Sequence, residues 1–238
     1  MPQLSPPAAS AADTPRPPLS PAPVLSRRDS VVQELRRAVV RGTLRPGDKL
    51  TEVNLSETLA VSRPTIREAL NQLAQEGLLV QEPYRGLRVA SLEPSQILDI
   101  ARTRQALDML AVDAILEDDG GRRMTAVQEC WAEYSRWEND PDPLTRHEAH
   151  VAFHRGLWAA SENSMLLRMW PVTEAHLTIA LAQDQAIRSD PARASVVHHH
   201  LIDALQSRDR DLIEKAFTVH TIDSARELVS IIEGKDNT

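Results

Sequence analysis

The sequence predicts a mainly α protein in which an N-terminal winged helix-turn-helix is followed by an all-α bundle of about six helices. Three helical segments come first, and two strand-like runs follow them near residues 78–80 and 87–89, which is the element order of a winged helix-turn-helix. Beyond residue 90, apolar residues recur at helical spacing, and glycine occurs only at positions 120, 121, 156 and 234. A chain of 238 residues is long enough for both parts.

Composition sets the expected domain boundaries. Residues 1–29 contain eight of the sixteen prolines and cannot bury enough apolar surface to fold, so we expect a disordered tail. We place the winged helix-turn-helix at residues 30–90 and the all-helical domain at residues 91–238. A single cysteine excludes an internal disulfide and indicates a reducing cytoplasm. No apolar run reaches the roughly 18 residues that span a membrane.

Each element of the winged module has its own local signal. The first helix carries an apolar stripe and ends at Gly42, and a second short helix is expected over residues 54–60. Ser62 is the predicted N-cap of the third helix, its oxygen accepting a hydrogen bond from a free backbone N–H. Pro64 fits the first turn of that helix, and Gly77 is a C-cap signal. Residues 83–86 form the turn between the two strands.

The outer face of the third helix carries polar side chains that could read DNA. Its buried face leaves Arg63, Thr65, Arg67 and Asn71 exposed near the helix start, where such a helix enters a major groove. An arginine fork can bond two acceptors on guanine or clamp a phosphate. Residues 30–90 have a net charge of +2 and residues 91–238 a net charge of −10, so cations are enriched in this module. A winged helix used for protein contacts is the alternative.

These same segments resemble a known family. The segments at 42–47, 55–60, 61–70, 76–78 and 85–86 are similar to the GntR family of bacterial transcriptional regulators, over residues 30–90. The order Pro64-Thr65 reverses the one more common in the family, and Val53 stands where some members carry a DNA-contacting arginine. The resemblance implies an operator-binding module. Its expected DNA contacts are Ser62, Arg63, Thr65, Arg67, Asn71, Arg85 and Gly86.

The helical part contains all eight histidines of the chain, at positions 147, 150, 154, 176, 198, 199, 200 and 220. We place its helices near residues 94–118, 122–138, 143–161, 163–184, 191–207 and 210–233. His150 and His154 are four residues apart and therefore share a helix face. His198 and His220 lie on the last two helices. Neutral imidazoles that converge from three helices would bind a late first-row divalent metal.

A second resemblance covers most of residues 95–230. Phe153-His154, the segment 160–163, His198 and His220 are similar to the effector domain, known as FCD, of the FadR-type subfamily of GntR regulators. Metal-binding members have a carboxylate four residues before the first histidine, and here His150 takes that place. Arg104 matches a family arginine near the effector pocket, and Asn163 is either an effector contact or a helix cap. The resemblance implies the metal ligands His150, His154, His198 and His220.

The ligand set constrains the metal and the effector. An all-nitrogen site favours zinc, nickel or copper over manganese or magnesium, with zinc or nickel as our expectation. Four neutral imidazoles leave the charge of a divalent cation uncompensated, so we expect an anionic effector, a small carboxylate. Arg104 would hold its far end through charge-assisted hydrogen bonds.

Three alternatives stay open at this point. Rotation of the helix could turn His199 or His200 inward in place of His198. The metal could be purely structural, with DNA binding independent of any small molecule. A metallohydrolase is the third alternative, but His147-Glu148-Ala149-His150-Val151 lacks the spacing of the zinc-protease motif. No nucleophile elbow, phosphate loop or dinucleotide fingerprint is present either, so no enzyme is predicted.

The winged module alone buries too little surface for useful specificity, so we expect a homodimer on an inverted-repeat operator. We expect a repressor whose effector changes the placement of the two DNA-binding domains. The linker from Ser91 to Pro94 is the expected joint.

Overall fold

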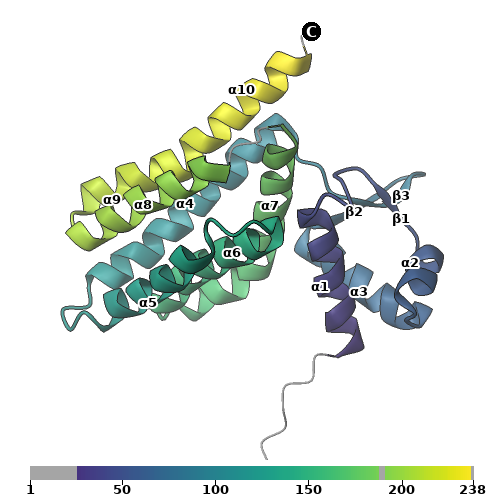
Figure 1. The fold of residues 1–238 in the computed structure, drawn as a ribbon, viewed down its shortest axis with the longest axis horizontal. Helices are drawn as coiled ribbons and strands as arrows, with labels where there is room; N and C mark the ends of the chain where they lie inside the picture. The colour runs from purple at the N-terminus through teal and green to yellow at the C-terminus, as the bar shows by residue number, and fades with distance from the viewer. Residues whose placement is uncertain (1–25, 188–190, 237–238) are drawn as a thin grey trace, which may run out of the picture.

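The computed structural model describes residues 26–187 and 191–236 of the chain. A small N-terminal domain lies beside a helical domain, with helix α7 between them (Figure 1). The predicted fold class is confirmed, since three helices and a small sheet precede a bundle of helices. Among the described residues, no helix combines the length and apolar composition needed to cross a lipid bilayer.

The first helix starts earlier than the sequence suggested. Helix α1 spans Arg27–Val40, and the side chain of Ser26 caps it by accepting a hydrogen bond from the backbone N–H of Asp29. The expected tail boundary at residue 29 is therefore wrong, because this cap and the acidic first turn stabilise a helix start within the segment assigned to the tail. Residues 1–25 of the predicted tail lie outside the described residues.

The other elements of the N-terminal domain form a helix-turn-helix and a wing. Helix α2 spans Glu52–Leu59, and α3 spans Arg63–Glu76. Strands β2 (Leu79–Glu82) and β3 (Gly86–Val89) pair antiparallel, and a short strand β1 (Lys49–Leu50), which the sequence did not indicate, pairs with the other edge of β3.

The predicted cap at Ser62 is wrong in its chemistry. Ser62 occupies the N-cap position of α3, but its side chain caps no backbone N–H. Its hydroxyl lies 2.9 Å from the hydroxyl of Thr65, so the two side chains satisfy each other. Pro64, at the second position of the helix, has no N–H to offer. Gly77 does end the helix, with a left-handed φ of 90°.

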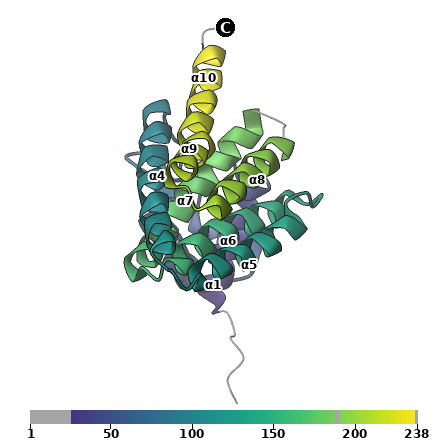
Figure 2. The ribbon, with the colours of Figure 1, turned by 90° about the vertical axis from the view of Figure 1, so that its left-hand side faces the viewer.

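The helical domain is a bundle whose helices closely follow the predicted ranges (Figure 2). The structure gives the bounds α4 Pro94–Leu116, α5 Arg122–Trp137, α6 Pro143–Ala160, α7 Ser164–Ile187, α8 Pro191–Ser207, α9 Arg210–Thr218 and α10 Ser224–Asp236. The last predicted helix is not regular. A π turn, η1 (Val219–Asp223), joins α9 to α10 and contains His220.

The two domains share one hydrophobic core. Leu35 of α1 belongs to the same buried cluster as Ile97 of α4 and Ile179 of α7. Arg36 reinforces this contact, because it forms ion pairs with Glu76 of α3 and Glu174 of α7. The N-terminal domain is therefore packed directly on α7 and is not only tethered to the bundle by a linker.

Candidate functional site

Four histidines from three helical segments meet inside the bundle. His150 and His154 come from α6, His198 from α8 and His220 from the π turn. Their candidate ligand nitrogens all lie within 4.8 Å of one another. The Nε2 atom of His154 is 3.1 Å from the Nε2 atoms of both His198 and His220. The structure thus brings together the four residues that the sequence proposed as metal ligands.

Hydrogen bonding among the four rings leaves some of their nitrogen atoms without a partner. The Nε2 atom of His150 and the Nδ1 atom of His154 are buried without a hydrogen-bond partner in the described part of the chain. Burial also holds the pKa values of His150, His154 and His220 well below the usual histidine range. Neutral, underbonded imidazoles are the form that binds a transition metal, so these residues fit a metal ion.

The π turn positions His220. A π turn inserts one extra residue into a helix and is often found at functional sites. Here it places His220 against the α6 and α8 histidines, and Thr221 beside the same space. Each residue of a regular α-helix turns the chain by about 100°. Without the extra residue of the π turn, His220 could face the cluster only if α9 or α10 changed its packing.

A buried ion pair lies behind His220. Arg104 Nη2 is 3.2 Å from His220 Nε2, and Arg104 Nε is 3.4 Å from a carboxylate oxygen of Asp108. The indole of Trp158 donates a 2.6 Å hydrogen bond to the other Asp108 oxygen. Burial raises the pKa of Asp108, and the Arg104 guanidinium beside it offsets part of that rise. Asp108 and Trp158 thus fix the arginine that faces the cluster. Sequence reasoning missed this pair, although Arg104 and Asp108 have the i, i+4 spacing of helical partners.

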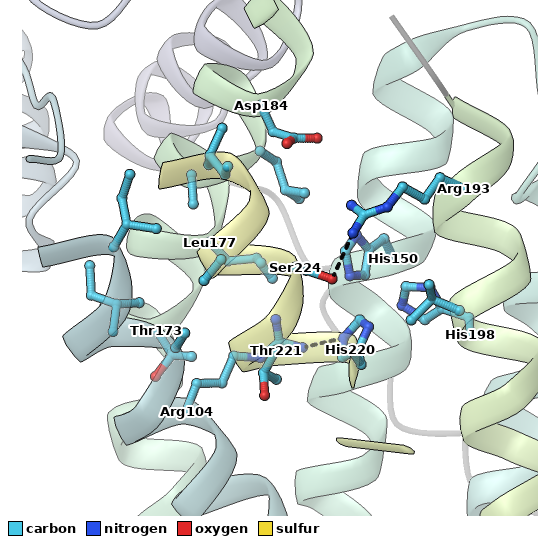
Figure 3. Close-up of a pocket in the computed structure, with 18 residues that line it drawn as sticks. Arg104, His150, Thr173, Leu177, Asp184, Arg193, His198, His220, Thr221 and Ser224 are labelled. Carbon is cyan, nitrogen blue, oxygen red and sulfur yellow. Dashed lines mark hydrogen bonds between the residues drawn. The ribbon is translucent and has the colours of Figure 1, made fainter. Parts of the chain in front are cut away.

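A cavity of about 170 Å³ adjoins the histidines (Figure 3). His150, His198, His220 and Arg104 line one end, whereas His154 is fully buried and is not among the described lining residues. Arg193 and Asp184, which sequence reasoning missed, line another part of the wall. Helices α4, α7 and α10 provide most of the remaining wall.

The other predicted residues of this domain lie elsewhere. Asn163 is not among the described residues that line the cavity, and its side chain accepts a hydrogen bond from the backbone of Met165 at the start of α7. The structure therefore gives it the helix-cap role, and its effector contact stays a prediction. In the histidine triplet, His198 is the buried member, while His199 and His200 are exposed and His199 contacts Glu138.

The predicted DNA face is a separate, exposed surface on α3 and the wing. Arg63, Arg67 and Arg85 each expose more than half of their side chains. Arg67 forms two hydrogen bonds of 2.8 Å with Glu52 of α2, and Arg63 lies 3.9 Å from the same carboxylate. Asn71 and Ser62 are exposed on the same helix, Thr65 is half-buried, and Gly86 opens β3 with a left-handed φ of 85°. Sequence reasoning missed Glu52, which orients both arginines.

These features define a two-domain protein of the DNA-binding regulator class, with a ligand-sized cavity behind a winged helix-turn-helix. A family model described as bacterial regulatory proteins, gntR family, matches residues 27–89, and the FCD domain model matches residues 99–223. The chain belongs to the GntR family of bacterial transcriptional regulators and carries an FCD domain. It is therefore a DNA-binding transcriptional regulator, and its family is not one of enzymes.

Individual relatives are more distant. The chain is 28% identical to a Paenarthrobacter nicotinovorans protein whose name makes it a transcriptional repressor of a D-xylose utilization operon, over 81% of this chain and 83% of the relative. It is 26% identical to the gluconate operon transcriptional repressor of Bacillus licheniformis, over 81% and 82%. The solved structure of E. coli McbR/YncC has the same fold, with a TM-score of 0.69, 21% identity, and coverage of 87% of this chain and 99% of that one.

Proposed function

We propose that this regulator is a repressor that binds a divalent transition metal and a small carboxylate effector in its helical domain. The observation that carries the proposal is the buried cluster of four histidines with unsatisfied nitrogens at the end of a cavity. The repressor role is supported by the names of the two relatives above. Zinc or nickel suits four nitrogen ligands.

The residues at the histidine end of the cavity suit an anion. The metal would be held by His150, His154, His198 and His220 and would supply a positively charged anchor for a carboxylate oxygen. None of these ligands carries a compensating negative charge when neutral, so the site favours an anionic ligand. Arg104 adds a second positive group at the same end of the cavity, held in place by Asp108. A guanidinium is well suited to carboxylate recognition.

Helix α7 supports control of DNA binding by the ligand. Leu177 of α7 lines the cavity, Glu174 of the same helix pairs with Arg36 of α1, and α7 also contacts α3. A ligand that shifts α7 therefore acts directly on α1 and α3, which both contact α7. The ligand changes the equilibrium only by its differential affinity for the two arrangements.

On the DNA side we propose a homodimer on an inverted repeat, with Arg63 and Arg67 of each protomer at bases or nearby phosphates. Replacing Arg63 by alanine should cost about 1–3 kcal/mol of operator affinity if it is a bidentate guanine contact. Fluorescence anisotropy measures this, with an operator selected from random DNA by the parent protein. Arg136→Ala, which replaces an exposed arginine of α5, is the control. Unchanged affinity of the Arg63 variant at physiological salt would show that the recognition-helix assignment is wrong.

The metal proposal is tested by elemental analysis of the native full-length protein and by acetate titration. The double variant His154→Ala, His198→Ala should lose both the metal and acetate binding. His200→Ala removes an exposed histidine of the same helix and should keep both. The proposal fails if the native protein holds no transition metal and the double variant binds acetate as the parent does.

A further inference from the structure

We infer that the effector is an apolar carboxylate whose body is about the size of one six-membered ring. This inference rests on the proposed function, since it takes the histidine end of the cavity as the carboxylate anchor. The rest of the wall is mainly aliphatic and comes from α4, α7, α8 and α10. Its apolar members are Ile97, Ile100, Ala101, Leu177, Ala180, Leu181, Val197, Ala225 and Leu228.

The hydroxyl groups in the wall are already engaged within the protein. Thr173 donates to the carbonyl oxygen of Met169, and Thr221 donates to that of Phe217. Ser224 donates to the carbonyl oxygen of Val219. Arg193 pairs with Glu227 (Figure 3 shows its contact with Ser224). These hydroxyl groups therefore have no hydrogen left to donate to a ligand, and Arg104, Asp184 and Arg193 are the charged residues of a wall that is otherwise mainly aliphatic.

The size of the cavity matches a compact ligand. Its volume of about 170 Å³ compares with about 150 Å³ for an apolar cavity that accepts benzene. A sugar acid would place several hydroxyl groups against aliphatic side chains, and those hydroxyl groups would lose their hydrogen bonds to water without replacement. The ligand class inferred here therefore differs from the sugar and the sugar acid in the names of the two relatives.

Isothermal titration of the metal-loaded full-length protein tests the ligand class. The probes are cyclohexanecarboxylate, acetate and gluconate, with cyclohexylmethanol as the ring without a carboxylate. Cyclohexanecarboxylate should bind at least about tenfold more tightly than acetate or gluconate, because only its ring buries apolar surface in the cavity. Ala180→Leu fills part of the cavity and should weaken cyclohexanecarboxylate while leaving acetate unchanged.

The outcomes separate this inference from the proposed function. Gluconate binding as tightly as cyclohexanecarboxylate, or equal binding of acetate and the ring acid, would overturn the apolar class while leaving the carboxylate anchor intact. Binding of cyclohexylmethanol as tightly as the acid would show that the histidine end does not anchor a carboxylate. That result would overturn both the carboxylate effector of the proposed function and the apolar carboxylate inferred here.

The tip of the wing carries a second and independent inference: we propose that the ring of Tyr84 packs into the minor groove of the operator. Tyr84 lies in the turn between β2 and β3, next to the exposed Arg85, and its side chain is fully exposed. Its φ is 63°, a left-handed conformation that is unusual for a bulky residue. The ring thus occupies a strained position without burying surface in the protein. Proteins that enter the minor groove often insert apolar side chains there.

Opposite effects on folding and binding distinguish this role from a structural one. Tyr84→Gly relieves the left-handed strain, so the thermal midpoint of the free protein should rise. Operator affinity should fall by at least about fivefold, because the apolar contacts of the ring with the minor groove are lost. Tyr84→Asn, which tolerates the same φ, should bind as weakly as Tyr84→Gly, and Tyr84→Phe should retain parental affinity within about threefold.

Salt dependence provides the matched comparison with the neighbouring residue. Arg85→Ala should make operator affinity less sensitive to salt because a phosphate contact is lost, whereas Tyr84→Gly should leave the salt slope unchanged. Operator affinity of Tyr84→Gly within twofold of the parent overturns the proposal. A loss for Tyr84→Phe as large as that for Tyr84→Gly overturns the ring contact.

Discussion

At the scale of single residues, the most consequential group outside the histidine cluster is Asp108. Its carboxylate is fully buried between Arg104 and the indole of Trp158. Asp108→Ala leaves a buried guanidinium without its partner, so we expect a loss of about 3–5 kcal/mol in the free energy of unfolding. Urea denaturation of the metal-free protein measures this loss. Asp113→Ala, which breaks an exposed pair with Arg210, should cost about 1 kcal/mol or less, and equal losses would contradict the argument.

His147 gives a residue-scale prediction about pH. Burial lowers its pKa to about 4, whereas an unfolded chain has a histidine pKa of about 6.5. Below pH 6.5 the unfolded state therefore binds more protons, and stability falls as the pH decreases towards 4. His147→Gln should reduce this slope by up to about 1.4 kcal/mol per pH unit. Chemical denaturation of the chelator-treated protein between pH 4.5 and 7.5 checks this, and parallel curves for variant and parent would refute it.

At the scale of elements, Gly77 couples the end of α3 to the helical domain. A methyl group on Gly77 would approach Nε2 of His176 on α7 to 3.3 Å, and the φ of Gly77 is 90°. Gly47 has a similar φ of 87° but open space around it. Gly47→Ala should cost about 1–2 kcal/mol from the left-handed backbone alone. Gly77→Ala should cost more, and the difference in unfolding free energy measures the contact with α7. Equal costs would mean that His176 moves aside freely.

The elements also show which features sequence alone could predict. The helices and the shared face of His150 and His154 follow from periodicity and spacing, which are local signals. The choice of His198 and His220 followed from the resemblance to the FCD domain. The start of α1 at Arg27 was missed because a proline-rich composition outweighed a single capping serine. Strand β1 and the π turn at His220 were missed because each depends on partners far along the chain. The Glu52 contact with Arg67 likewise requires the mutual placement of two helices.

At the scale of the whole molecule, the contact between the domains determines whether ligand binding in the cavity can change DNA binding. Arg36 of α1 pairs with Glu174 of α7, and Leu92 and Gln183 exchange two hydrogen bonds at the linker. Because α7 also lines the cavity, movement of that helix changes the cavity and its contact with the N-terminal domain together. A joint that acted only through residues 91–94 would not need this packed interface.

Glu174→Gln tests this coupling directly. The variant retains the cavity wall, so its affinity for cyclohexanecarboxylate should equal that of the parent. The effect of that ligand on operator affinity should shrink by about 2- to 5-fold, the magnitude of one ion pair near the surface. Glu148→Gln breaks the exposed pair between Arg37 and Glu148 of α6 and serves as the matched control. By linkage, operator DNA must change the ligand affinity by the same factor, so both titrations should agree. Parental coupling in Glu174→Gln would show that the effector signal bypasses α7.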